Sequence, residues 1–147
     1  LDELNKLLET EVNKTNIINF PIHKRIKKIL MQRLDLLKKD KIFYKKTFNH
    51  LMLPQNLKIM KKNLYKTVDS MWYLAGDNST DFNFYTKRLT LAVIYVNALI
   101  VFFNNDYNKA ESNIDKNLKI ISRIPKFKNR FSFIRENLPI FIKGFFN

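Results

Sequence analysis

The sequence predicts an all-α fold, a helical bundle, and three observations lead to that prediction. Apolar residues recur along most of the chain at the spacing that places them on one face of a helix. Gly76 and Gly144 are the only glycines among 147 residues, and the four prolines lie far apart, so the chain lacks the turns that many short strands need. With 46% apolar and 14% aromatic residues, the chain is large and apolar enough to bury a core.

Six helices are expected before residue 125, and several have a recognisable start or end. Asp2 and Glu3 lie in the first turn of the first helix, where the helix dipole favours acidic side chains. Pro21 and Pro54 are each placed to open a helix, and Gly76 follows the fourth helix where a left-handed cap needs a residue without a side chain. The expected helices cover residues 1–12, 21–37, 42–52, 54–75, 81–103 and 107–124.

The stretch Leu89–Phe103 is apolar nearly all round, which requires cover on every side. A membrane span needs about 20 apolar residues. This stretch is shorter and is interrupted by Thr90 and Asn97. It is therefore predicted to be a buried core helix rather than a membrane span.

The net charge of +14 favours an anionic partner, either nucleic acid or anionic lipid, although an AT-rich genome, which inflates the number of lysines, explains the same excess. Between Lys24 and Lys66 the chain has 14 basic residues against 2 acidic ones. These basic residues fall on the polar faces of complete amphipathic helices. No nucleic-acid partner is therefore expected.

The residue types that catalysis needs are scarce. There is no cysteine, and the two histidines, His23 and His50, lack the acidic neighbours of a helix-borne metal site. Two isolated glycines cannot form a phosphate-binding loop, and no GxSxG motif surrounds a serine. We therefore expect no catalytic residue, no metal site and no cofactor, and a protein that is not an enzyme.

Two sets of residues are candidates for binding. Asp81, Phe84, Tyr85 and Arg88 fall on one stripe of a helix, with Arg88 able to lie over the ring of Phe84. If this stripe is exposed, its residues have the composition of an interface hot spot. In the alternative, both aromatic side chains face the core and the charged ones are solvated. The second set could line a tunnel for a flexible apolar chain, because methionine and aromatic side chains fill irregular spaces, although periodicity alone favours a dry core. Its members are Met52, Leu57, Met60, Leu64, Met71, Trp72, Leu91 and Tyr95.

The segment Trp72–Arg88 reads WYLAGDNSTDFNFYTKR. It resembles the signature W-Y-x-A-G-D-x-S-T-D-x-N-x-Y-T-K/R-R of the coenzyme Q (ubiquinone) biosynthesis accessory lipid-binding protein family, the Coq nine type. The flanks LMLPQN (51–56), LYKTVD (64–69) and LAVIY (91–95) agree with that family, as does the IPK at 124–126. The resemblance extends over most of the chain from about Phe20.

The resemblance implies a fold like the ligand-binding and dimerisation domain of TetR-family regulators, without the amino-terminal helix-turn-helix remnant. It implies a homodimer, for which we expect the helices around Leu89–Phe103 and Ile114–Ile124 to form the interface. It assigns Asp81, Tyr85 and Arg88 to a patch that faces the demethoxyubiquinone hydroxylase, a di-iron membrane enzyme. Phe84 departs from the family's tryptophan and lacks its indole N–H.

We expect residues 1–124 to form the lipid-binding domain and 125–147 a basic, aromatic tail. The acidic, helical start at Leu1 is expected to be a domain cut. In the family a carboxyl-terminal amphipathic helix contacts the membrane, and the tail has a similar mixture of basic and aromatic residues. The alternative is that the tail packs on its own domain. Its predicted contacts with an anionic membrane are Lys126, Phe127, Lys128, Arg130, Phe131, Phe141, Phe145 and Phe146.

The function implied is that of a non-catalytic accessory protein. It would bind an isoprenoid quinone precursor and present it to the hydroxylase. The expected location is the cytoplasmic face of a bacterial inner membrane or the matrix face of the mitochondrial inner membrane. Two alternatives remain open: a ligand-responsive TetR-like transcriptional regulator that lacks its DNA-binding half, and a purely structural interaction protein with a dry core.

Overall fold

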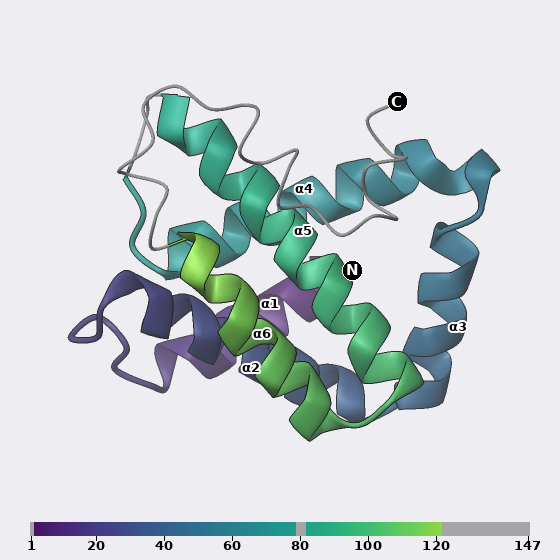
Figure 1. Ribbon diagram of the computed structural model, residues 1–147, viewed down its shortest axis with the longest axis horizontal. Helices are drawn as coiled ribbons and strands as arrows, with labels where there is room; N and C mark the ends of the chain where they lie inside the picture. The colour runs from purple at the N-terminus through teal and green to yellow at the C-terminus, as the bar shows by residue number, and fades with distance from the viewer. Residues whose placement is uncertain (1, 79–81, 122–147) are drawn as a thin grey trace.

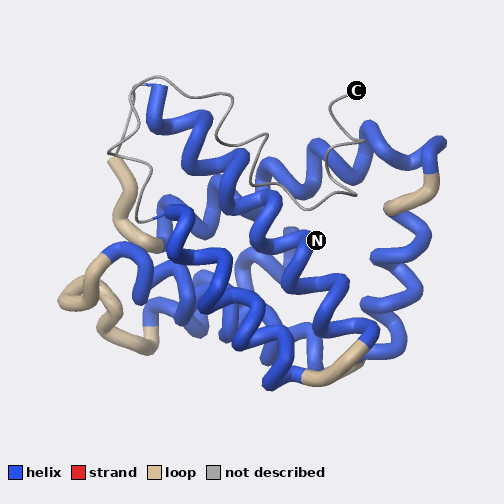
Figure 2. Tube along the Cα trace, in the orientation of Figure 1, coloured by secondary structure: helices blue, strands red, loops and turns tan. Residues whose placement is uncertain are grey.

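The computed structural model describes residues 2–78 and 82–121, and within these ranges it contains helices and no strand (Figures 1 and 2). The all-α prediction is therefore confirmed. The predicted carboxyl-terminal amphipathic helix and the rest of the tail lie outside the described residues. In chain order the elements are α1 (Asp2–Asn13), α2 (Ile22–Lys38), α3 (Lys41–Leu51), the 3₁₀ helix η1 (Pro54–Asn56), α4 (Leu57–Leu74), α5 (Phe82–Asn104) and α6 (Tyr107–Ile121).

The two prolines act at helix starts in different ways. Pro21 is the N-cap of α2, and its carbonyl oxygen accepts hydrogen bonds from the backbone N–H groups of Lys24 and Arg25. Pro54 opens the short helix η1, and α4 begins after it at Leu57. The single helix expected from residue 54 is thus divided into a 3₁₀ turn and an α-helix, because the turn closes with a bond from Asn56 N–H to the carbonyl of Leu53.

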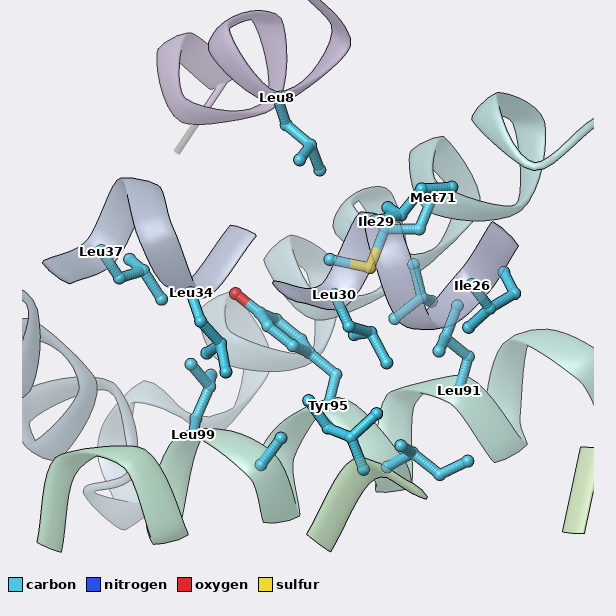
Figure 3. Close-up of a cluster of buried hydrophobic side chains, with 14 of the residues drawn as sticks. Leu8, Ile26, Ile29, Leu30, Leu34, Leu37, Met71, Leu91, Tyr95 and Leu99 are labelled. Carbon is cyan, nitrogen blue, oxygen red and sulfur yellow. The ribbon is translucent and has the colours of Figure 1, made fainter. Parts of the chain in front are cut away.

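Helix α2 packs most extensively against α1 and α6, then against α4, and contacts α3 and α5 over shorter stretches. Its apolar face is fully buried, and the side chains in Figure 3 converge on it from α1, α4 and α5. Each buried aliphatic side chain contributes about 1.5–3 kcal/mol relative to an exposed one. The labelled core residues of α2 are Ile26, Ile29, Leu30, Leu34 and Leu37.

Helix α5 supplies most of the remaining core. It packs against α4 on one side and lies antiparallel beside α6 on another (Figure 1). By length and composition Phe84–Asn104 could cross a membrane, but 56% of its most apolar 18-residue window is buried inside the fold. Leu91, Ile94 and Phe102 are among its fully buried side chains. The apolar character of α5 is therefore accounted for by its place in the core.

An ion-pair cluster joins α2 to α6 at the surface. The Lys27 ammonium lies 2.9 Å from Glu111 Oε1 and 2.8 Å from Asp115 Oδ1. Hydrogen bonds to Asp115 and Glu111 raise the pKa of Lys27. Because Lys27 stays protonated, this contact holds the carboxyl-terminal part of the described chain on α2.

Helix α3 is the most loosely held element. None of its residues is fully buried, and it stands at one edge of the molecule, where it contacts α2 and α4 (Figure 1). Ile42 and Phe43 are exposed, while Tyr44 and Phe48 pack against the core from its inner side. Little buried area therefore opposes a small displacement of this helix.

Gly76 ends α4 in the left-handed conformation that the sequence predicts, with φ of 81°. Its N–H donates to the carbonyl of Tyr73 and the N–H of Asp77 donates to the carbonyl of Trp72, which together form a Schellman motif. Beside it, Arg25 donates from Nη1 to the carbonyl of Ala75 at 2.9 Å. A Cβ on Gly76 would lie 3.2 Å from that same nitrogen. The positive φ therefore favours glycine here, and a Cβ would in addition crowd the Arg25 side chain.

Gly76→Ala is expected to lower the free energy of unfolding by about 1–2 kcal/mol, because an L side chain with positive φ is strained. Urea denaturation followed by circular dichroism measures the change. Gly76→Asn is the matched variant, since asparagine tolerates the left-handed region better, and it should lose less than the alanine variant despite its larger side chain. Equal losses in the two variants would mean that space, not conformation, sets the requirement.

Candidate functional site

A cavity of about 80 Å³ lies between α2, α3, α4 and α5, and Leu4 of α1 also borders it. Most of its wall is apolar and includes Leu37, Phe48 and Leu99. A site for one water needs about 10–15 Å³ on this measure, so the space can take a small ring or a few carbon atoms. Ligand pockets are typically larger, about 300–1,000 Å³ in total volume. A longer ligand therefore requires the loosely packed α3 to move.

The predicted lipid-binding residues divide into three groups. Met60, Leu64 and Tyr95 line the cavity. Met71, Trp72 and Leu91 do not line it, since they are completely buried in the dry core, where Figure 3 shows Met71 and Leu91 among α2 side chains. Met52 and Leu57 are half-buried near η1 and also lie outside the cavity wall. Five of the eight predicted residues lie outside the cavity wall because helical spacing identifies the buried face of a helix but not which residues of that face border a cavity.

Sequence reasoning missed Arg33, which contributes the charge in the cavity wall. This side chain is fully buried, and its Nε donates to the hydroxyl oxygen of Tyr95 at 3.2 Å. Its Nη1 and Nη2 have no hydrogen-bond partner among the described residues. A signal was present, because Arg33 falls in the apolar register of α2, three residues after Leu30 and four before Leu37.

The family-like signature contains a buried ion-pair network where α4 and α5 meet. Arg88 Nε lies 2.6 Å from Asp69 Oδ1, and Arg88 Nη1 lies 3.2 Å from Asp77 Oδ2. The side chains of Arg88 and Asp77 are almost entirely buried, whereas Asp69 is partly exposed. The guanidinium carbon is 3.3 Å from the centre of the Phe84 ring, as the spacing of these two residues predicts.

The expectation that Arg88 lies on an exposed stripe is therefore wrong. The acids Asp69 and Asp77 draw Arg88 inward, and it also donates to the carbonyl of Phe84 at 3.2 Å. These acids precede the helix, so the spacing within the stripe could not reveal them. Tyr85 does point outward, with 68% of its surface exposed, while Phe84 is half-buried under Arg88. Asp81 lies outside the described residues.

Other signature residues complete the same corner. The indole N–H of Trp72 donates to the carbonyl of Lys87 at 3.0 Å, and the Lys87 ammonium lies 2.7 Å from Asp77 Oδ1. Gly76 and its cap place Asp77 between Lys87 and Arg88. Tyr73, by contrast, is 74% exposed. The described signature residues Trp72, Asp77, Lys87 and Arg88 thus join α4 to α5, while Tyr73 and Tyr85 lie on the surface.

The remaining site predictions concern absences and the tail. Within residues 2–78 and 82–121, no group of three or more metal-ligating side chains occurs, and both histidines are exposed. The predicted membrane contacts from Lys126 to Phe146 lie outside the described residues.

Comparison with known proteins gives a consistent result. The COQ9 family model matches residues 58–124, which span α4 to α6 and include the whole ion-pair corner from Asp69 to Arg88. The resemblance to the COQ9 family is confirmed. Ubiquinone biosynthesis protein COQ9, mitochondrial, of Bos taurus is 52% identical over 50 residues, which make up 34% of this chain and 16% of the bovine protein. The Homo sapiens protein of the same name is 56% identical over 45 residues, or 31% of this chain and 14% of the human protein.

A longer match extends the COQ9 resemblance beyond the signature. Probable ubiquinone biosynthesis protein coq9, mitochondrial, of Dictyostelium discoideum is 26% identical over 132 residues, covering 87% of this chain and 43% of the relative. The chain therefore spans less than half the length of the curated relatives it matches. The relation to TetR-type regulators stays a prediction.

Arg88→Met is expected to lower the free energy of unfolding by about 3 kcal/mol, because it leaves the buried Asp77 without one of its cations. Tyr85→Ala, on the same helix but exposed, should change stability by less than about 0.5 kcal/mol. Chemical denaturation of both variants measures the difference. An Arg88→Met protein as stable as the parent would mean that the buried pair does not hold the corner. If Arg88→Met is destabilised as expected, a variant at Arg88 cannot separate a loss of partner binding from a loss of stability.

Proposed function

We propose that this chain is the core of a non-catalytic accessory protein of ubiquinone biosynthesis. It would bind an isoprenoid quinone precursor and present it to the demethoxyubiquinone hydroxylase at a membrane. The observation that carries the proposal is the COQ9 match, because the relatives are named as ubiquinone biosynthesis proteins and the matched segment contains most of the described site. The names of these relatives also support a mitochondrial location, for which we propose the matrix face of the inner membrane.

The cavity supports the lipid part of the proposal. Its wall is mainly apolar, and one side of it is α3, none of whose residues is fully buried. A lipid head or the first carbon atoms of a chain would fit this space, which is partly open to solvent. The rest of an isoprenoid chain would enter by displacing α3, which loses little buried area when it moves.

The partner part of the proposal rests on two exposed tyrosines of the signature. Tyr73 and Tyr85 are 74% and 68% exposed, and the contacts of the ion-pair corner involve neither of their hydroxyl groups. Exposed tyrosines are enriched among residues that dominate protein interfaces. We therefore assign the hydroxylase-facing surface to these two residues and keep Arg88 as the residue that holds their helices together.

Native mass spectrometry of the purified chain tests lipid binding. The parent is expected to carry a copurifying isoprenoid lipid, and Leu64→Trp should lose most of it because the larger side chain fills the cavity. Ile59→Trp is the control, since Ile59 is 54% exposed on α4 and does not line the cavity. A parent without lipid, or equal lipid in all three proteins, would count against the proposed pocket.

Pull-down of the hydroxylase tests the partner surface. Tyr85→Ala is expected to weaken binding at least tenfold, since an interface hot spot contributes about 2 kcal/mol or more. Phe43→Ala removes another exposed aromatic residue, from α3 and outside the matched region, and should leave binding unchanged. Equal capture by the parent and Tyr85→Ala would remove this surface from the proposal while leaving lipid binding in place.

A further inference from the structure

The outward face of α3, at one edge of the molecule, combines exposed apolar and basic side chains (Figure 1). Ile42 and Phe43 are neighbours in its first turn and are 74% and 56% exposed. Lys46 and His50 follow Ile42 by four and eight residues and are also exposed, so all of them lie on one side of the helix. A partner that covered this side would remove two large apolar side chains from water.

The charge along this part of the chain is positive. Helix α3 contains three lysines and no acidic residue, and after Asp40 the next acidic residue in the sequence is Asp69. Asp40 itself is the N-cap of α3, and its carboxylate accepts a hydrogen bond from the Phe43 N–H at 3.1 Å. The exposed apolar pair therefore lies in a basic setting.

One more acid comes close to the start of α3. The Lys41 ammonium donates to the carbonyl of Asn105 at 3.1 Å, and Asp106 is the next residue in the chain. The Asp106 carboxylate accepts from the Lys109 N–H at 2.7 Å, at the start of α6. This acid thus draws on Lys41 and α6, while Lys46 lies more than a turn further along α3.

A bilayer that contains anionic lipid is the partner that fits this combination. Lysines are attracted to its negative surface, and large apolar side chains insert at the boundary between head groups and acyl chains. Nucleic acid would attract the same lysines through its phosphates, but a phosphate backbone offers no apolar contact to Ile42 and Phe43. The exposed apolar pair therefore favours the membrane.

We propose that the outward face of α3 is a membrane-contact surface, with Ile42 and Phe43 inserted among lipid head groups and Lys46 beside anionic ones. The opposite face of the same helix borders the cavity through Tyr44, Phe48 and others. Helix α3 thus lies between the cavity and this surface. Contact there places the cavity next to the bilayer, so that an apolar molecule enters past α3 without crossing bulk water.

This inference rests on the proposed function and deepens it, because presenting a lipid at a membrane requires a surface that touches the membrane. It is separate from the predicted tail contacts, which lie outside the described residues. A test must therefore report on α3 itself and not only on binding by the whole chain.

A tryptophan placed on α3 is such a reporter. Ile42→Trp is expected to shift its emission to the blue, and to be quenched, on vesicles of brominated phosphatidylcholine mixed with phosphatidylserine. Tyr73→Trp is the matched control, since Tyr73 is also 74% exposed but lies at the end of α4 far from α3. Trp72, the only native tryptophan, is fully buried and gives both variants the same background.

Binding of the full chain to the same vesicles tests the charge. Lys46→Gln should weaken it about fivefold, the effect of one lysine near an anionic surface. Lys116→Gln removes the same charge from an exposed position on α6 and should leave binding nearly unchanged. Circular dichroism checks that each exposed variant keeps the parent's helicity.

Three results would overturn the inference. If the chain binds vesicles but Ile42→Trp is quenched no more than Tyr73→Trp, α3 is not the contact, while a membrane role through another part of the chain stands. If the chain binds no vesicles, the membrane part of the proposed function fails as well. If Lys46→Gln weakens binding to a DNA duplex and not to vesicles, the partner of this surface is nucleic acid.

Discussion

The corner between α4 and α5 depends on one buried guanidinium, that of Arg88. It joins Asp69 within α4 to Asp77 just after the end of that helix, and it packs on the ring of Phe84 in α5. A buried charge is tolerated only where opposite charges and hydrogen bonds surround it, so the positions of these residues are mutually fixed. The Gly76 cap belongs to the same constraint, because it turns the chain so that Asp77 faces Arg88.

The two buried arginines have different consequences for function. The Arg88 network closes on itself and gives the bundle a rigid corner, from which Tyr73 and Tyr85 are presented to solvent. Arg33 is fully buried on α2, where its Nε donates to the Tyr95 hydroxyl and no carboxylate of the described residues pairs with it. The Arg88 network therefore fixes two helices against each other, while Arg33 links α2 to α5 through a single hydrogen bond.

Helix α3 forms one side of the cavity. Around it the core is dense, with α2 buried against α1, α4, α5 and α6. Helix α3 instead touches α2 and α4, with one ring contact from Phe48 to Phe103 of α5, and buries none of its residues fully. A weakly held helix beside an apolar cavity is compatible with the lipid binding proposed above.

The sequence by itself determined the helical class, the approximate bounds of the six described helices and the left-handed Gly76 cap, because these follow from local spacing and from the conformational limits of single residues. It also contained the COQ9 resemblance. The tertiary structure alone decided that Arg88 and Arg33 are buried. Both depend on which side chains approach from other helices, and no periodicity along one helix contains that information.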